Sequence, residues 1–157
     1  MAAGYLEGDL IIGKNHKSAL SALLERTTQF TILVPVKGKE AKTVREAFAE
    51  VFSEIDPEMK KSMTYDRGVE MTEHKILTEQ TGAKVYFADR RSPWQSGTNE
   101  NTNSLIRQYF PKGTDFSKVT LQQIKFAQDR LNNRPRKVLN WSTTLKAFKT
   151  LTGALKN

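Results

Sequence analysis

The chain lacks cysteine altogether and has only two histidines, His16 and His74. The absence of cysteine excludes disulfide bonds, thiol catalysis and thiolate metal sites. Two histidines are too few for a histidine-based zinc site unless acidic residues complete it. No apolar run approaches the roughly 18 residues of a membrane span, and no signal peptide opens the chain. These absences predict a soluble, intracellular protein without membrane contact.

Acidic residues are outnumbered, with 17 Asp and Glu against 25 Lys and Arg and a formal net charge of +8 over 157 residues. The excess lies mainly beyond Ser104, where the only acids are Asp115 and Asp129. A basic domain often binds a polyanion, most commonly nucleic acid, although charge alone fits a purely solubilising role equally well. The length suits a single domain, which buries roughly 70% of its unfolded surface and needs no covalent crosslink.

Hydrophobic periodicity predicts an α/β chain whose elements follow the order β-β-β-α-β-α-β-α-α. The strands are expected at 5–12, 19–28, 30–36, 61–65 and 84–87, and the helices at 40–55, 72–80, 98–109 and 121–132; after these elements, a last helix is expected at 142–151. Residues 19–28 also fit a helix, because their leucines recur at helical spacing. Short connections predict an antiparallel meander for the first three strands, and the strand–helix–strand unit at 61–87 predicts parallel pairing.

Three acids occupy unusual places in this pattern. Asp9 interrupts the apolar strand at 5–12, Asp66 ends the strand at 61–65, and Glu100 begins the helix at 98–109. Each also has an ordinary explanation. Asp9 fits a strand-end residue that faces solvent, Asp66 fits a common Asp-x-Gly turn, and an acid such as Glu100 is favoured by the helix dipole.

The element order resembles that of a ribonuclease H-like fold, which implies a five-stranded mixed sheet of order 3-2-1-4-5 with flanking helices. In such a fold the three acids would converge. Two carboxylates about 5 Å apart repel by roughly 3 kcal/mol at an effective dielectric of about 20, so the cluster must take up a proton or bind cations. Oxygen ligands suit Mg²⁺ or Mn²⁺, and two such ions about 3.5–4 Å apart can promote an in-line phosphoryl displacement.

Long motifs carry a more specific resemblance. They are Glu-Gly-Asp-Leu-Ile-Ile-Gly-Lys (7–14), Thr-Tyr-Asp-Arg-Gly-Val-Glu-Met (64–71), Ser-Pro-Trp-Gln-Ser-Gly-Thr-Asn-Glu-Asn-Thr-Asn (92–103), Arg-Gln-Tyr-Phe-Pro-Lys-Gly-Thr-Asp (107–115) and Leu-Asn-Asn-Arg-Pro-Arg-Lys (131–137). With them the chain resembles the catalytic core of a DDE transposase of the retroviral-integrase superfamily, most similar to the insertion-sequence-30 family. Asp66 and Glu100 have 33 residues between them, as the motif of that family expects.

The resemblance implies that Asp9, Asp66 and Glu100 are the catalytic residues and the ligands of two Mg²⁺ or Mn²⁺ ions. It implies hydrolysis at transposon ends, followed by transfer of the freed 3′-hydroxyl to target DNA, with self-association and no small-molecule cofactor. It places the protein in the bacterial cytoplasm, in association with the nucleoid. Residues 1–157 would form one catalytic core, weakly active alone, without the N-terminal helix-turn-helix region of the family. The chain departs from the family at Leu6 and Tyr65, where tryptophan is usual, and near Thr144 and Lys146.

Basic and polar residues near the motifs are predicted to contact DNA. They are Lys14, His16, Arg67, Trp94, Gln95, Asn99, Asn103, Arg107, Lys112, Arg134, Arg136 and Lys137. Trp94 fits either stacking on a base or packing against the helix of Glu100. Two other functions remain open at this stage: a plain nuclease of the same fold, and a catalytically silent DNA-binding or self-association module.

Overall fold

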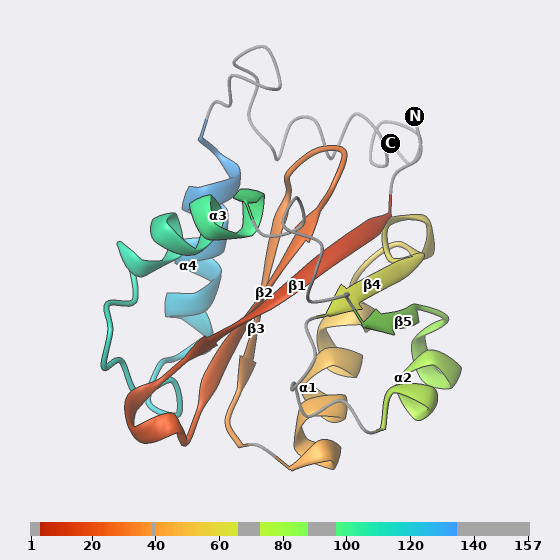
Figure 1. The fold of residues 1–157 in the computed structure, drawn as a ribbon, viewed down its shortest axis with the longest axis horizontal. Coiled ribbons are helices and arrows are strands. Elements are labelled where there is room, and N and C mark those ends of the chain that lie inside the picture. The colour runs from red at the N-terminus through yellow and green to blue at the C-terminus, as the bar shows by residue number, and fades with distance from the viewer. Residues whose placement is uncertain (1–3, 39, 66–72, 88–96, 135–157) are drawn as a thin grey trace.

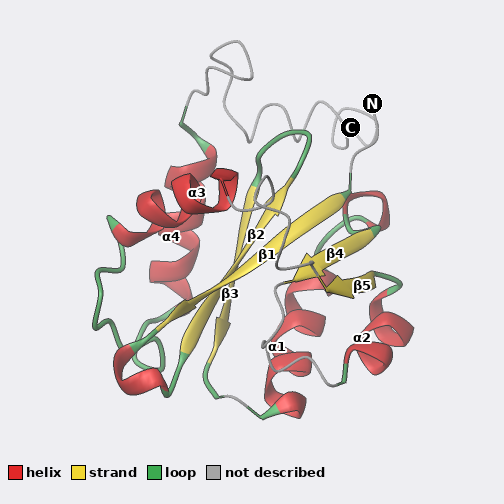
Figure 2. Ribbon diagram, in the orientation of Figure 1, coloured by secondary structure: helices red, strands yellow, loops and turns green. Residues whose placement is uncertain are grey.

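The computed structural model describes residues 4–38, 40–65, 73–87 and 97–134, with the side chains of 97–101 excepted. A five-stranded sheet of order β3-β2-β1-β4-β5 lies between helices on both of its faces (Figures 1 and 2). The strands are β1 (Tyr5–Ile12), β2 (Ala19–Glu25), β3 (Thr31–Val36), β4 (Ser62–Tyr65) and β5 (Lys84–Phe87). The order confirms the predicted mixed sheet.

Strand pairing follows the predicted pattern. β1 pairs with β2 and β2 with β3 in antiparallel fashion, whereas β1–β4 and β4–β5 are parallel. The helical alternative for residues 19–28 is wrong, because Ala19–Glu25 form the strand β2. All seven residues of β2 are buried, as expected for a strand covered on both faces. β2 also ends earlier than predicted. The carboxylate of Glu25 accepts hydrogen bonds from the amides of Thr27 and Thr28, at 3.2 and 2.7 Å, and so stabilises a turn there.

The helices are α1 (Ala41–Ser53), α2 (His74–Thr81), α3 (Gly97–Arg107) and α4 (Leu121–Asn132), with 3-10 turns η1 (Lys14–His16) and η2 (Pro57–Met59). α4 begins with a capping box in which Thr120 and Gln123 satisfy each other's backbone amides. α2 ends at Gly82, whose φ of 79° is the left-handed conformation that glycine adopts readily. The helix expected at 142–151 lies outside the described residues.

Each face of the sheet has its own hydrophobic core. On one face Leu23 and Met63 pack with Phe48 of α1 and Leu77 of α2. On the other face the core joins β1–β3 to α3 and α4, and it includes Ile11, Leu20, Leu33, Ile106, Phe116 and Leu131. Because successive residues of a strand point to opposite faces, Asp9 shares the α3–α4 face with Ile11.

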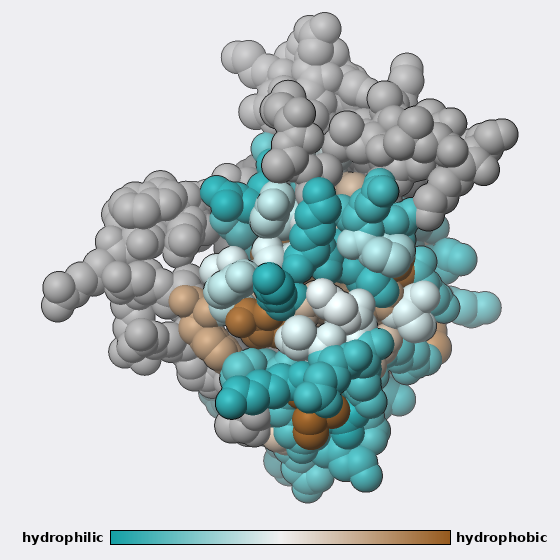
Figure 3. Space-filling model, turned by 90° about the vertical axis from the view of Figure 1, so that its right-hand side faces the viewer, coloured by the Kyte–Doolittle hydropathy of each residue, from teal (hydrophilic) through white to brown (hydrophobic). Residues whose placement is uncertain are grey.

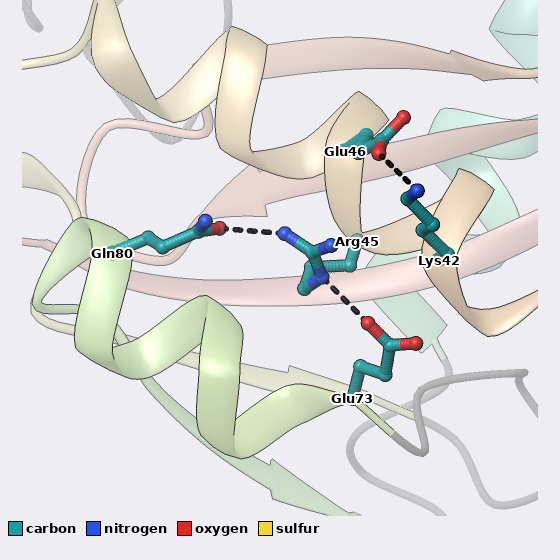
Figure 4. A network of polar contacts seen from close by, with 5 residues as sticks. All are labelled: Lys42, Arg45, Glu46, Glu73 and Gln80. Atoms are coloured by element: carbon teal, nitrogen blue, oxygen red, sulfur yellow. Dashed lines mark hydrogen bonds and ion pairs between the residues drawn. The ribbon is translucent and has the colours of Figure 1, made fainter.

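A polar network fastens α1 to α2 at the surface. The Arg45 guanidinium donates to the Glu73 carboxylate at 2.7 Å and to the Gln80 side chain at 3.0 Å, as Figure 4 shows. Lys42 and Glu46 form a longer and more exposed pair of 3.9 Å on α1. The side of the molecule shown in Figure 3 is mainly hydrophilic, with small hydrophobic patches. Within the described ranges, no helix has both the length and the apolar character needed to cross a bilayer.

The free edge of β3 is covered by side chains of α4. The Asn132 amide accepts from the Thr31 backbone N–H and donates to the Thr31 carbonyl, both at 2.8 Å. Gln128 accepts from the Leu33 N–H at 3.0 Å. These amides replace part of a neighbouring strand, and they explain Asn132 of the 131–137 motif as a structural residue.

Candidate active site

Asp9 lies in the middle of β1, which is the central strand of the sheet. It is half-buried and pairs with Ala22 of β2, so it is not a strand-end residue that faces solvent. Its Oδ1 accepts a hydrogen bond of 2.8 Å from the Leu10 amide, and its Oδ2 accepts one of 2.6 Å from Nδ2 of Asn103. Among the described residues, one hydrogen bond on each oxygen orients the carboxylate and leaves lone pairs on both atoms for a cation.

Asn103 comes from α3, one turn beyond Glu100. Its Nδ2 is used by Asp9, whereas its Oδ1 is buried and none of the described residues donates to it. A buried oxygen without a hydrogen-bond partner is costly unless another ligand satisfies it. Asn103 was predicted as a DNA contact; in the structure its amide lies against the candidate acid.

Arg107, one turn further along α3, also reaches β1. Its guanidinium donates to the carbonyl of Ile12 at 3.1 Å and to those of Phe110 and Pro111 at 3.3 Å. Together Asn103 and Arg107 fasten α3 along β1 at two points, near the middle of the strand and at its end. The predicted contact of Arg107 with DNA stays a prediction; three backbone carbonyls accept hydrogen bonds from its guanidinium in this structure.

β4 brings the second acid-bearing segment to β1. Tyr65, the residue before Asp66, pairs with Gly8, the residue before Asp9, in the parallel register. Asp66 itself lies outside the described residues, and of Glu100 only the backbone, within α3, is described. The structure therefore brings together Asp9, Asn103 and Tyr65, and it leaves the complete triad a prediction.

Tyr65 is a site residue that the sequence reasoning missed. It is fully buried, and its hydroxyl donates to the Asp9 carbonyl at 3.3 Å and hydrogen-bonds with Oγ of Ser21. Burial raises the pKa of Tyr65 well above its usual value, and the negative charge of Asp9 raises this pKa further. The phenol is therefore a neutral donor. The available signal was Gly8, since an isolated glycine within a strand indicates a close approach by another group.

The side-chain oxygens of the described site residues suit a metal ion that prefers oxygen ligands. Asp9 supplies carboxylate oxygens and Asn103 a buried, unsatisfied amide oxygen, the atom types that Mg²⁺ and Mn²⁺ prefer. Where side chains are described, no group of three His, Cys, Asp or Glu gathers, and Asp66 and Glu100 fall outside that set. A surface hollow of about 420 Å³ between Tyr109 and Phe126 is lined by no acid, so it gives no competing site of this chemistry.

Several predicted DNA contacts lie on two adjoining loops. Lys14 and His16 are exposed in η1, and Lys112 is exposed in the loop after α3. The Lys14 amide donates to the Thr114 carbonyl at 2.9 Å, which joins the two loops. Hydrogen bonds from Ser117 lower the pKa of Asp115, and the charges of Lys118 and Lys14 lower it further. Lys17 and Lys118, which the sequence reasoning did not select, are exposed on the same loops.

The remaining predicted contacts are separate from these loops. Arg134, beyond α4, donates to the Gln108 side chain at 3.1 Å. The side chain of Asn99 and the whole of Arg67, Trp94, Gln95, Arg136 and Lys137 lie outside the described part of the chain. Their contacts with DNA stay predictions.

The fold places the protein in a structural class. The structure matches the catalytic core domain of BIV integrase with a TM-score of 0.72, over 98% of this chain and 99% of that one, at 13% sequence identity. It therefore has the ribonuclease H-like fold of an integrase catalytic core. No protein-family model matches the chain.

Sequence comparison narrows this class to a family. The chain is 46% identical over 140 residues to "Transposase InsI for insertion sequence element IS30A" of Escherichia coli K12, across 89% of its own length. It is 43% identical over 145 residues to the transposase for insertion sequence element IS1086 of Cupriavidus metallidurans, across 92% of its length. Its homologues are thus IS30-family transposases, which confirms the resemblance seen in the motifs. The chain spans 36% and 43% of the lengths of these two relatives.

Proposed function

We propose that this chain is the metal-dependent core that cleaves and joins DNA strands during transposition of an insertion sequence. The observation that carries the proposal is the surroundings of Asp9. The helix that contains Glu100 hydrogen-bonds to the Asp9 carboxylate through Asn103, and the strand that leads into Asp66 hydrogen-bonds to the Asp9 carbonyl through Tyr65. Segments distant in sequence thus meet at one acid.

Two geometric arguments support a triad of Asp9, Asp66 and Glu100. Continuing the parallel register of Gly8 and Tyr65 by one residue would set Asp66 beside Asp9. On α3, position 100 precedes Asn103 by one turn, and positions three apart share a helix face. Since Asn103 contacts Asp9, Glu100 would come from the same side of the sheet. Three carboxylates so close together would have to take up a proton or bind cations to offset their repulsion.

The proposed cofactor is a pair of Mg²⁺ or Mn²⁺ ions held by the three acids. When bound, such a pair supplies Lewis-acid stabilisation of the attacking and leaving oxygens of a phosphodiester. Residues of the chain orient the proposed ligands before a metal ion binds. The Leu10 amide and Asn103 orient the Asp9 carboxylate, and Arg107 fastens α3 to β1. The hydrolysis of transposon ends and the transfer to target DNA are proposed for this site.

The proposed partner is duplex DNA, and the two joined basic loops are its proposed phosphate contact. Lys14, Lys17, Lys112 and Lys118 are all exposed there, with Asp115 as a neighbouring acid. Phosphate contacts by lysine give affinity without sequence preference. From the length of the chain we propose that residues 1–157 fold as a single domain, and from the family resemblance we propose self-association on DNA.

A cleavage and strand-joining assay on labelled duplex ends with Mn²⁺ tests the proposal. Asp9→Asn and Glu100→Gln should each lower the rate by about two orders of magnitude or more, because loss of a metal ligand forfeits several kcal/mol of transition-state stabilisation. Glu79→Gln, which makes the same change at an exposed position of α2, is the matched control and should retain activity.

Wild-type rates in Glu100→Gln would remove Glu100 from the mechanism. Joining activity in none of the proteins, combined with DNA binding that is insensitive to Mn²⁺, would favour the catalytically silent module instead.

A further inference from the structure

We propose that Tyr65 is a positioning residue of the metal site. Its hydroxyl fixes the backbone of Asp9 relative to the segment that leads into Asp66. This inference rests on the proposed function, because it concerns the spacing of two of the proposed metal ligands. Tyr65 touches neither substrate nor ion in this scheme; it acts through Asp9.

The ring of Tyr65 lies against β1 where β1 has no side chain. A Cβ atom built on Gly8 would stand 2.3 Å from Cε2 of the ring and 2.6 Å from Cδ2, so only glycine leaves room for it. Phe48 of α1 packs edge-on against the ring, with centroids 5.8 Å apart and an interplanar angle of 88°. Gly8 and Phe48 therefore contact the ring from two directions and fix its orientation, which directs the hydroxyl toward the Asp9 carbonyl and Ser21.

The hydroxyl links three neighbouring strands. It belongs to β4, it donates to the Asp9 carbonyl of β1, and it hydrogen-bonds with Ser21 of β2. Because the phenol proton goes to Asp9, the Ser21 hydroxyl donates to the phenol oxygen. Ser21 and Tyr65 are both fully buried, so this chain of hydrogen bonds is shielded from water.

The location of the link argues for a role beyond packing. Gly8–Tyr65 is the last pair of the β1–β4 register among the described residues, so the phenol acts at the pair that directly precedes Asp9 and Asp66 in the sequence. Phenylalanine would fill the same space without burying a polar atom, and a buried hydroxyl is costly unless it is paired. Its partner is the carbonyl of a proposed metal ligand. Groups that orient ligands typically change metal affinity by 10–100-fold when removed.

The test measures Mn²⁺ binding to the full chain from the electron paramagnetic resonance signal of free Mn²⁺, with and without a short DNA duplex. Tyr65→Phe should weaken Mn²⁺ binding about tenfold, and Ser21→Ala should weaken it several-fold, because each removes part of the link. Tyr86→Phe removes a hydroxyl that is exposed on β5 and should leave binding unchanged. Strand joining by Tyr65→Phe should be lost first at limiting Mn²⁺ and recover at high Mn²⁺.

The outcomes separate this inference from the proposed function. If Tyr65→Phe and Ser21→Ala lower the melting temperature but bind Mn²⁺ as the wild type does, Tyr65 is a packing residue and the inference is overturned alone. If Tyr65→Phe does not fold, Ser21→Ala decides, because it removes one of the two hydrogen bonds of the phenol and leaves the Tyr65 side chain in place. If the wild type binds no Mn²⁺ under either condition, the proposed function fails and the inference fails with it.

Discussion

The amide of Asn103 donates a 2.6 Å hydrogen bond to Oδ2 of Asp9, across 94 residues of sequence. The donor belongs to α3 and the acceptor to the central strand, so this contact fixes how the helix of Glu100 approaches the sheet. Position 103 therefore requires a side chain with a hydrogen-bond donor, because it faces the carboxylate of Asp9.

Asn103→Asp should therefore destabilise the metal-free protein more than Asn103→Ala. Both lose the donor, but only the aspartate sets a second negative charge against Asp9, which costs about 4 kcal/mol at close range and an effective dielectric of about 20. The free energy of unfolding from urea titration at neutral pH measures the difference. The double variant Asp9→Asn/Asn103→Asp exchanges donor and acceptor and should recover most of the loss. No recovery would show that the two side chains do not pair in solution.

Gly8→Ala should cost about 2–3 kcal/mol of stability or more, because the new methyl group overlaps the Tyr65 ring and a packed core accommodates extra atoms poorly. Gly38→Ala is the matched control. Its Cβ would meet no atom of the described residues closer than 3.8 Å, so the stability of this variant should stay within about 0.5 kcal/mol of the wild type. Chemical denaturation compares the two, and equal stabilities would contradict the close approach of Tyr65 to Gly8.

Asn132→Ala should lower the free energy of unfolding by about 2–4 kcal/mol, because it leaves both the N–H and the C=O of Thr31 without the partner that they have here. Asn133→Ala is a neighbouring control of the same chemistry. Asn133 is exposed and its side chain donates one hydrogen bond, to the Asp129 carbonyl, so about 0.5–1 kcal/mol is expected. A larger loss in Asn133→Ala than in Asn132→Ala would count against the capped edge of β3.

Lys14→Ala/Lys112→Ala should weaken DNA binding and reduce its salt dependence. Each phosphate contact contributes about −0.9 to the slope of log K against log salt, so the slope should become shallower by about 2. Lys75→Ala/Lys84→Ala removes the same charge from exposed positions of α2 and β5 and should keep the wild-type slope. Fluorescence anisotropy over a range of salt concentrations measures both. Equal slopes in the two double variants would mean that net charge, rather than the joined loops, governs binding.

The fold was largely predictable, because in most helices and strands the buried apolar residues recur at the spacing typical of that element. Residues 84–87 and 121–132 have the predicted bounds, and α1 and β3 differ by one or two residues at their ends. Residues 19–28 were ambiguous for a physical reason. A strand buried on both faces has no polar side to reveal its period of two, and its leucines also match a helix. The sheet, and not the local sequence, decides between the two.

Of the described residues around the candidate site, the sequence singled out Asp9 as a candidate acid, but it did not identify the residues that contact Asp9. An aspartate inside an apolar run is costly without a partner, and that cost singled out Asp9. The partner could not be identified in the same way. Asn103 has no signal of its own, because its role depends on the approach of α3 to β1. Tyr65 and Gly8 likewise lie far apart in sequence, and only the register of β1 against β4 puts them in contact.

The covered edge of β3 also bears on the order in which the chain can fold. β1–β3 form from neighbouring segments, so this meander requires only short loops to close. The groups that cover its outer edge come from α4, and the partner of the Thr31 backbone, Asn132, lies 101 residues further along the chain. During synthesis the meander therefore presents an unpaired strand edge until α4 emerges and docks. During that interval the unpaired edge is available for pairing with another copy of the chain.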